Sequence, residues 1–140
     1  MWLGKIFDVR PRHQHRGLFF KGMGNVASHL FSVPPHKIAL PAVVLYELQV
    51  GIAKSNSPEK RSSQLNELLT LVRVLPFTEQ ETAITARIRA DLEKAGTPIG
   101  PLDIMIAGIA LANQATLVTH NTKEFSRIEG LRLEDWFEPF

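Results

Sequence analysis

The 140-residue chain contains no cysteine, so disulfide bridges and thiolate metal sites are excluded. Any bound metal would therefore need oxygen or imidazole ligands. Long apolar runs are also missing, because the longest candidate, residues 38–46, contains Pro41 and falls well short of the roughly 20 residues of a membrane span. The first residues lack the apolar core of a signal peptide. We therefore expect a protein of the reducing cytoplasm that does not enter a membrane.

Acidic residues are scarce at the start of the chain. Residues 1–37 carry six lysines and arginines but only one acid, Asp8, whereas the remainder holds 10 basic and 13 acidic residues. A basic arm on a mildly acidic body can bind nucleic acid. The alternative is that this end is non-native or disordered, and we favour that alternative.

The length fits one domain, and the apolar pattern predicts strands that alternate with helices. This order favours an α/β fold with a parallel sheet between helix layers. No clear period is visible in residues 1–17, so we divide the chain into an aberrant or disordered segment 1–17 and a domain 18–140. The expected helices are 26–31, 42–54, 58–71, 79–94 and 101–113, and the expected strands are 37–40, 72–75 and 115–119.

Glu47 is the only charged residue in a long apolar segment, residues 43–50. Burying an unpaired carboxylate costs several kcal/mol, and a bound cation would compensate for that cost. The alternative is a helix face on which Glu47 and Lys54 merely reach solvent.

Asp103 and Asn121 are the other two polar residues at predicted element ends. Asp103 lies in the first turn of an apolar helix, where an acid either complements the helix dipole or serves a ligand at the carboxyl ends of the strands. Asn121 follows a predicted strand. It is either a helix N-cap, with Glu124 completing a capping box, or a polar ligand at the strand end.

Each of these signals is weak alone, but their order and surroundings resemble the VapC family of PIN-domain toxins from about Phe19 to Trp136. The segments that carry the resemblance are Tyr46-Glu47-Leu48-x-x-Gly51, Thr97-Pro98-Ile99-Gly100-Pro101-Leu102-Asp103-Ile104-x-Ile106-Ala107, Leu117-Val118-Thr119-His120-Asn121-Thr122-x-Glu124-Phe125 and Gly130-Leu131-Arg132-Leu133-Glu134-Asp135-Trp136.

The resemblance implies a three-layer α/β/α fold in which carboxylates bind Mg²⁺ or Mn²⁺ and activate a water for RNA cleavage. By motif, Glu47 and Asp103 match metal-binding acids. Asn121 matches a further site position that is Asp in some members and neutral in others. The family further implies a tRNA or other RNA substrate, a VapB-type antitoxin that silences the enzyme, and a homodimer.

One family feature is missing, because the family opens on a strand that ends in Leu-Asp-Thr-Asn, whose Asp is the first metal ligand. Here Arg12-His13-Gln14-His15-Arg16-Gly17 precedes Leu18-Phe19-Phe20. Codons permitted for these residues, read one nucleotide later, give Asp-Thr-Asn-Thr-Val-Val-Tyr-Phe, preceded by Met-Phe-Ala-Leu. Loss of one T from the codons of Phe19 and Phe20 would create the frame seen here.

A frameshift therefore explains the first seventeen residues and predicts impaired activity. On this account His13 and His15 form no metal pair. The alternative is a genuine, divergent start in which residues 5–9 form the first strand and Asp8 supplies the acid. Three functions follow: a metal-dependent ribonuclease toxin, a non-catalytic remnant that still dimerises or binds an antitoxin, and a nucleic-acid binder that uses its basic arm.

Overall fold

The computed structural model describes residues 6–8 and 37–135. The predicted helix 26–31, most of the segment 1–17 and Trp136 lie outside the described residues. Along the described chain the elements are β1 (Ile6–Asp8), β2 (Ile38–Pro41), α2 (Ala42–Ala53), α3 (Pro58–Leu69), β3 (Arg73–Leu75), α4 (Glu79–Lys94), α5 (Pro101–Ala112), β4 (Thr116–Val118), α6 (Thr122–Phe125) and β5 (Arg132–Glu134).

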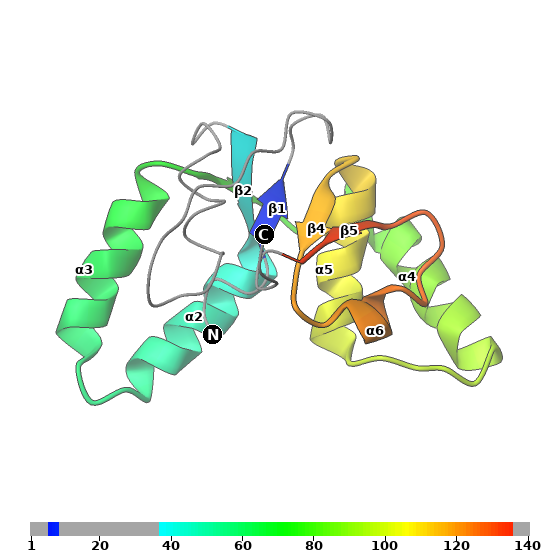
Figure 1. Ribbon diagram of the computed structural model, residues 1–140, viewed down its shortest axis with the longest axis horizontal. Coiled ribbons are helices and arrows are strands. Elements are labelled where there is room, and N and C mark those ends of the chain that lie inside the picture. The colour runs from blue at the N-terminus through cyan, green and yellow to red at the C-terminus, as the bar shows by residue number, and fades with distance from the viewer. Residues whose placement is uncertain (1–5, 9–36, 136–140) are drawn as a thin grey trace.

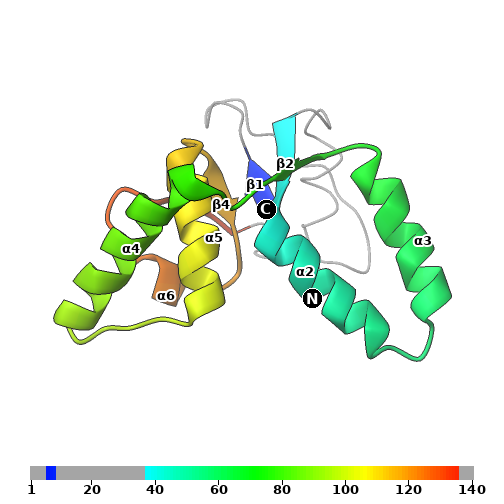
Figure 2. The same ribbon diagram turned by 180° about the vertical axis from the view of Figure 1, so that it is seen from behind.

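The long helices lie on both sides of the strands, with α2 and α3 toward one side and α4 and α5 toward the other (Figures 1 and 2). This arrangement confirms the expected α/β fold. Helix α4 has the predicted bounds, and α2, α3 and α5 each end one or two residues earlier than predicted. Strand β5 was not predicted as a strand, because its three residues carry little apolar pattern.

A reciprocal cap explains why α4 begins at Glu79. The backbone N–H and the hydroxyl of Thr78 both donate to Oε1 of Glu81, over 2.6 and 2.8 Å. These hydrogen bonds lower the pKa of Glu81, the bond from the Thr78 backbone having the largest effect. The sequence Thr-x-x-Glu thus starts the helix by satisfying donors that have no partner within it.

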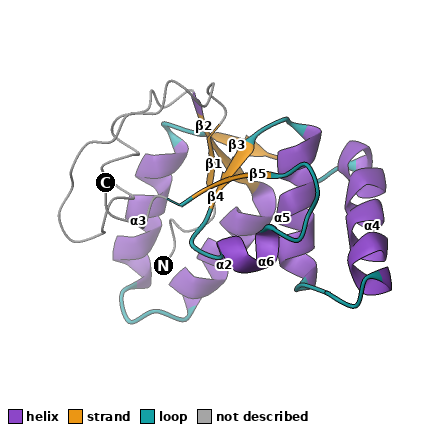
Figure 3. Cartoon of the chain, turned by 45° about the vertical axis from the view of Figure 1, so that its right-hand side comes forward, coloured by secondary structure: helices purple, strands orange, loops and turns teal. Residues whose placement is uncertain are grey.

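Helix α5 is the core of the domain and lies between α2 and α4 (Figure 3). Its central residues are fully buried, as its continuous apolar sequence predicts: Ile106, Ala107, Ile109 and Ala110. Gly108 allows α5 to approach α4 closely, because a Cβ at this position would lie 1.8 Å from Oγ1 of Thr85. The position of Asp103, in the first turn of α5, is therefore set by a tightly packed helix.

The sheet has the strand order β3-β2-β1-β4-β5, with β1 at its centre. Strands β2 and β3 pair in parallel, as do β4 and β5, whereas β1 is antiparallel to both of its neighbours. Four strands therefore run in one direction, and only the central strand is reversed. The expected parallel pairing is present in the two outer strand pairs, β2–β3 and β4–β5. The position of the first strand is filled by Ile6–Asp8, within the range 5–9 that we considered for it.

Candidate functional site

The carboxyl ends of β2 and β4 lie at the same edge of the sheet. Ala39 of β2 and Leu117 of β4 both pair with Phe7, so β2 and β4 lie at the same level on either side of β1. Two residues later β2 passes directly into α2, and β4 is followed by Thr119, His120 and Asn121. We call this the carboxyl edge, and open α/β sheets bind their ligands at this kind of edge.

Asp8 lies at the other end of the sheet. Because β1 is reversed, Asp8 pairs with Ile38 and Thr116, the first residues of β2 and β4. Its backbone is therefore at the amino edge, away from Asn121. The alternative in which Asp8 supplies the missing acid at the carboxyl edge is not supported by this register.

Glu47 and Asp103 both lie half-buried on helices that pack against each other, α2 and α5. Glu47 follows the exposed Tyr46 and precedes the buried Leu48, so it lies at the border between the exposed and the buried face of α2. Asp103 lies in the first turn of α5, and its Oδ2 is 3.9 Å from the point where a Cβ on Gly100 would lie. That the two carboxylates come within reach of one cation remains a prediction.

Asn121 occupies the N-cap position of α6, as one of its two interpretations predicted. Its carbonyl accepts a 3.4 Å hydrogen bond from the N–H of Phe125. Its side chain does not cap the helix, however, so the expected capping box with Glu124 does not include the Asn121 amide. A 3.0 Å hydrogen bond from the Asn121 N–H to Oγ1 of Thr119 fixes the turn after β4. The half-buried amide therefore stays a candidate for the site.

The carboxyl edge also holds a pair that sequence reasoning missed. Nδ1 of His120 lies 3.0 Å from Oδ2 of Asp135, which follows β5. These residues are fifteen positions apart, and only the pairing of β4 with β5 brings them together. Recognising residues 132–134 as a strand parallel to 116–118 would have placed both side chains at one edge.

The donor atoms of the three predicted site residues suit a hard cation. Glu47, Asp103 and Asn121 offer carboxylate and amide oxygens, which Mg²⁺ and Mn²⁺ prefer. Within residues 6–8 and 37–135, no three histidine or acidic side chains form a cluster that could hold a metal ion. The acids present thus match the chemistry of the implied ion, but the described part of the chain does not supply a full set of charges.

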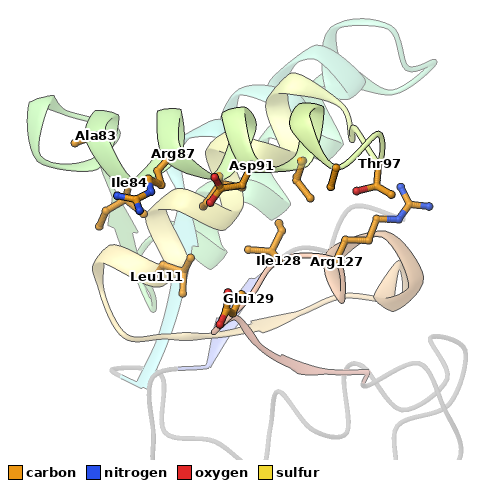
Figure 4. Close-up of a pocket in the computed structure, with 12 residues that line it drawn as sticks. Ala83, Ile84, Arg87, Asp91, Thr97, Leu111, Arg127, Ile128 and Glu129 are labelled. Atoms are coloured by element: carbon orange, nitrogen blue, oxygen red, sulfur yellow. The ribbon is translucent and has the colours of Figure 1, made fainter.

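A groove of about 630 Å³ lies elsewhere, between α4 and residues 127–129 (Figure 4). Its charged lining residues are Arg87, Asp91, Arg127 and Glu129. Because Glu47, Asp103 and Asn121 are absent from its lining, this groove is separate from the carboxyl edge. In the described part of the chain, the helices are all too short or too polar to cross a bilayer.

Comparison with known proteins identifies the family. Residues 26–131 match the PIN domain model, so residues 1–25 lie outside the match. The chain is 38% identical to the tRNA(fMet)-specific endonuclease VapC of Salmonella typhimurium, over 76% of this chain and 80% of the relative. It is 42% identical to ribonuclease VapC2 of Rickettsia felis, over 71% and 74%.

The solved structures agree with these relatives. The crystal structure of VapBC2 from Rickettsia felis bound to a DNA fragment from their promoter contains a chain that is 42% identical, with a TM-score of 0.68 and coverage of 70% of this chain and 74% of that one. The chain therefore belongs to the PIN-domain family and groups with its VapC ribonucleases.

Proposed function

We propose that this protein derives from a metal-dependent endoribonuclease toxin that acts on tRNA or other RNA in the cytoplasm. The observation that carries the proposal is the match of residues 26–131, which include Glu47, Asp103 and Asn121, to the PIN domain, together with curated relatives that are ribonucleases. The Salmonella relative's name specifies tRNA(fMet), which supports a tRNA substrate. Solved structures of VapBC complexes support a VapB-type antitoxin, and we extend the proposal to a homodimer.

In this proposal Glu47 and Asp103 hold Mg²⁺ or Mn²⁺ through carboxylate oxygens, and Asn121 lines the same cleft. The bound ion would supply a water activated for attack on a phosphodiester. The packing of α5 against α4 limits the movement of the helix that carries Asp103. Glu47 lies on α2, which also packs against α5. Helix-borne carboxylates of this kind hold their positions better than side chains on loops do.

We further propose that this chain is impaired, because the central strand brings no acid to the carboxyl edge. The reversal of β1 and the start of the family match at residue 26 both support a foreign N-terminal sequence. A one-nucleotide frameshift accounts for that sequence. Without the first acid, two carboxylates attract the ion more weakly and in a looser geometry, and phosphodiester cleavage is sensitive to both.

The test is a paired assay of this chain and of the protein restored to the shifted reading frame, purified identically. We expect Mg²⁺- or Mn²⁺-dependent cleavage of bulk tRNA by the restored protein, loss of cleavage with chelator, and little or no cleavage by this chain. Equal cleavage by this chain, abolished by Asp8→Asn, would show that the N-terminus is genuine. No cleavage by either protein would instead favour the second candidate, a non-catalytic remnant that binds an antitoxin or dimerises.

The second candidate rests on the intact body of the domain. Helices α2 to α5 and the two parallel strand pairs are present in full, so surfaces that bind a partner can persist after the chemistry is lost. Co-purification of this chain with a VapB-type antitoxin, without RNA cleavage, is the expected result for such a remnant.

A further inference from the structure

The Arg127 side chain joins two segments that are far apart in the sequence. Its Nη1 donates a 3.3 Å hydrogen bond to the carbonyl of Pro98, which lies 29 positions earlier in the chain. Residues 97–100 form the loop that precedes α5. Figure 4 shows the Arg127 side chain extending toward Thr97 in this loop. The hydrogen bond therefore ties the segment after α6 to the segment before α5.

On one side of this bond, the backbone of Arg127 is held close to Asn121. Asn121 is the N-cap of α6, and its carbonyl accepts the hydrogen bond from the N–H of Phe125. The Arg127 N–H donates to the carbonyl of Glu124 over 3.2 Å, which continues the turn beyond the end of α6. Phe125 and Ile128 are buried on either side of Arg127. The position of Arg127 relative to Asn121 is therefore set by α6 and by the core.

On the other side of the bond, Pro98 lies close to Asp103. Gly100 is the N-cap of α5, and its carbonyl accepts a 3.0 Å hydrogen bond from the N–H of Ile104. The Asp103 carboxylate lies beside the backbone of Gly100, 3.9 Å from the point where a Cβ would be. Ile99 is buried, but Pro98 and Gly100 are exposed, so burial alone does not hold them in place. A shift of the loop at Pro98 would therefore move the first turn of α5 and with it Asp103.

The surroundings of Arg127 do not favour an alternative role as an RNA contact. The groove that Arg127 lines also contains Arg87, Asp91 and Glu129. Two positive and two negative side chains leave this groove without a net charge, so it offers an RNA backbone little attraction. Arginine suits a tie between two segments, because its guanidinium holds several donors in fixed directions.

We propose that Arg127 is a positioning residue, whose bond to the Pro98 carbonyl fixes the placement of Asp103 relative to Asn121. In this role the guanidinium acts through the loop 97–100 and touches neither the RNA nor the metal ion. The assignment rests on the proposed function, since Asp103 and Asn121 belong to the proposed metal site.

The first test measures native-state hydrogen exchange in the whole chain and needs no catalysis. Arg127→Met removes the donors but keeps an apolar stem in the groove. The Ile104 amide should then exchange about two- to tenfold faster, the range expected for the loss of one hydrogen bond. The Asn113 amide, at the far end of α5, should not change. Arg87→Met is the matched control, because it removes a guanidinium from the same groove but not the bond to Pro98.

The second test measures cleavage of bulk tRNA by the frame-restored protein with saturating Mg²⁺ or Mn²⁺. Arg127→Met should lower kcat by about tenfold or more, because small displacements of a site residue slow the chemical step. KM should change little, since the substrate is still bound. Arg127→Lys should recover part of kcat, because an ammonium can donate to the same carbonyl. Arg87→Met should leave both constants unchanged.

Several results would overturn the assignment. Unchanged exchange at Ile104 in Arg127→Met would show that the bond does not hold the start of α5. Faster exchange with a normal kcat would give Arg127 a purely structural role and would spare the proposed function. A raised KM with a smaller salt slope of RNA binding would indicate a phosphate contact instead. No cleavage by the restored protein with Arg127 intact would reject the proposed function itself, and the assignment with it.

Discussion

Gly108 of α5 and Thr85 of α4 are in direct contact: a Cβ at Gly108 would lie 1.8 Å from the Thr85 hydroxyl oxygen and 3.3 Å from the Thr85 Cα. The hydroxyl cannot turn away without loss, because it donates a 2.7 Å hydrogen bond to the carbonyl of Glu81. This contact sets the distance between α4 and α5, and through α5 it sets the position of Asp103.

Gly108→Ala should therefore destabilise the fold. Overpacking of a buried contact typically costs about 1–3 kcal/mol, and here neither backbone can move far. Urea denaturation followed by circular dichroism measures the change. Gly51→Ala is the matched control, because nothing lies within 4 Å of a Cβ at that helical position. That control should be neutral or stabilising by up to about 1 kcal/mol. Equal effects of the two variants would contradict the close approach.

Glu81→Gln should remove a pH-dependent part of the stability. The pKa of Glu81 is lowered in the folded protein, so its ionised form stabilises the fold at pH values above the ordinary value of 4.5. That contribution is lost as the pH falls through the lower, folded value. The unfolding free energies of the two proteins should thus differ most near neutral pH and converge in acid.

Glu79→Gln serves as the control for this measurement, since Glu79 is exposed in the same first turn of α4 but makes no capping bond to Thr78. A gap between Glu81→Gln and the unmodified chain that stays constant down to about pH 2 would contradict the capping role.

Asp103→Asn in the frame-restored protein should abolish metal-dependent RNA cleavage and growth toxicity. The change removes one negative charge from the proposed metal site and leaves the shape of the side chain nearly unaltered. Cleavage of bulk tRNA across a titration of Mg²⁺ or Mn²⁺ measures the effect. Asp91→Asn, at an exposed position of α4 in the separate groove, should cleave normally. Full activity of Asp103→Asn would remove Asp103 from the site.

The amides of β1 should exchange with solvent faster than those of Leu117–Thr119. Only three residues of β1 pair with the sheet, and its reversed direction interrupts an otherwise parallel set. Native-state hydrogen exchange compares the two strands directly. Equal protection would show that Ile6–Asp8 is a native central strand, and the frameshift account would then lose its structural support.

Much of the fold followed from local pattern. The bounds of α4 could be predicted because Thr78 and Glu81 form a capping box and Gly96 follows the helix. The buried character of α5 followed from its continuous apolar sequence. Strand β5 and the direction of β1 could not be predicted in this way, because both depend on pairing between segments far apart in the chain.

In the candidate site, too, some residues could be predicted from local sequence and others could not. Glu47, Asp103 and Asn121 stood out because each interrupts an apolar pattern or follows one. His120 and Asp135 did not, since an exposed histidine and an acid near the end of a chain are common on any surface. Their relationship arises from the alignment of Val118 with Glu134 in the β4–β5 ladder, which no local signal records.

The reversal of the central strand affects the pairing of the sheet and the proposed catalytic site differently. An extended segment of nearly any sequence can form backbone hydrogen bonds in either direction. A different segment can therefore take the place of the central strand between β2 and β4. The position of a carboxylate at one end of that strand does depend on direction, because reversing the strand moves the carboxylate to the opposite edge of the sheet. On the proposed frameshift, the domain therefore keeps a five-stranded sheet while the carboxyl edge lacks the first acid.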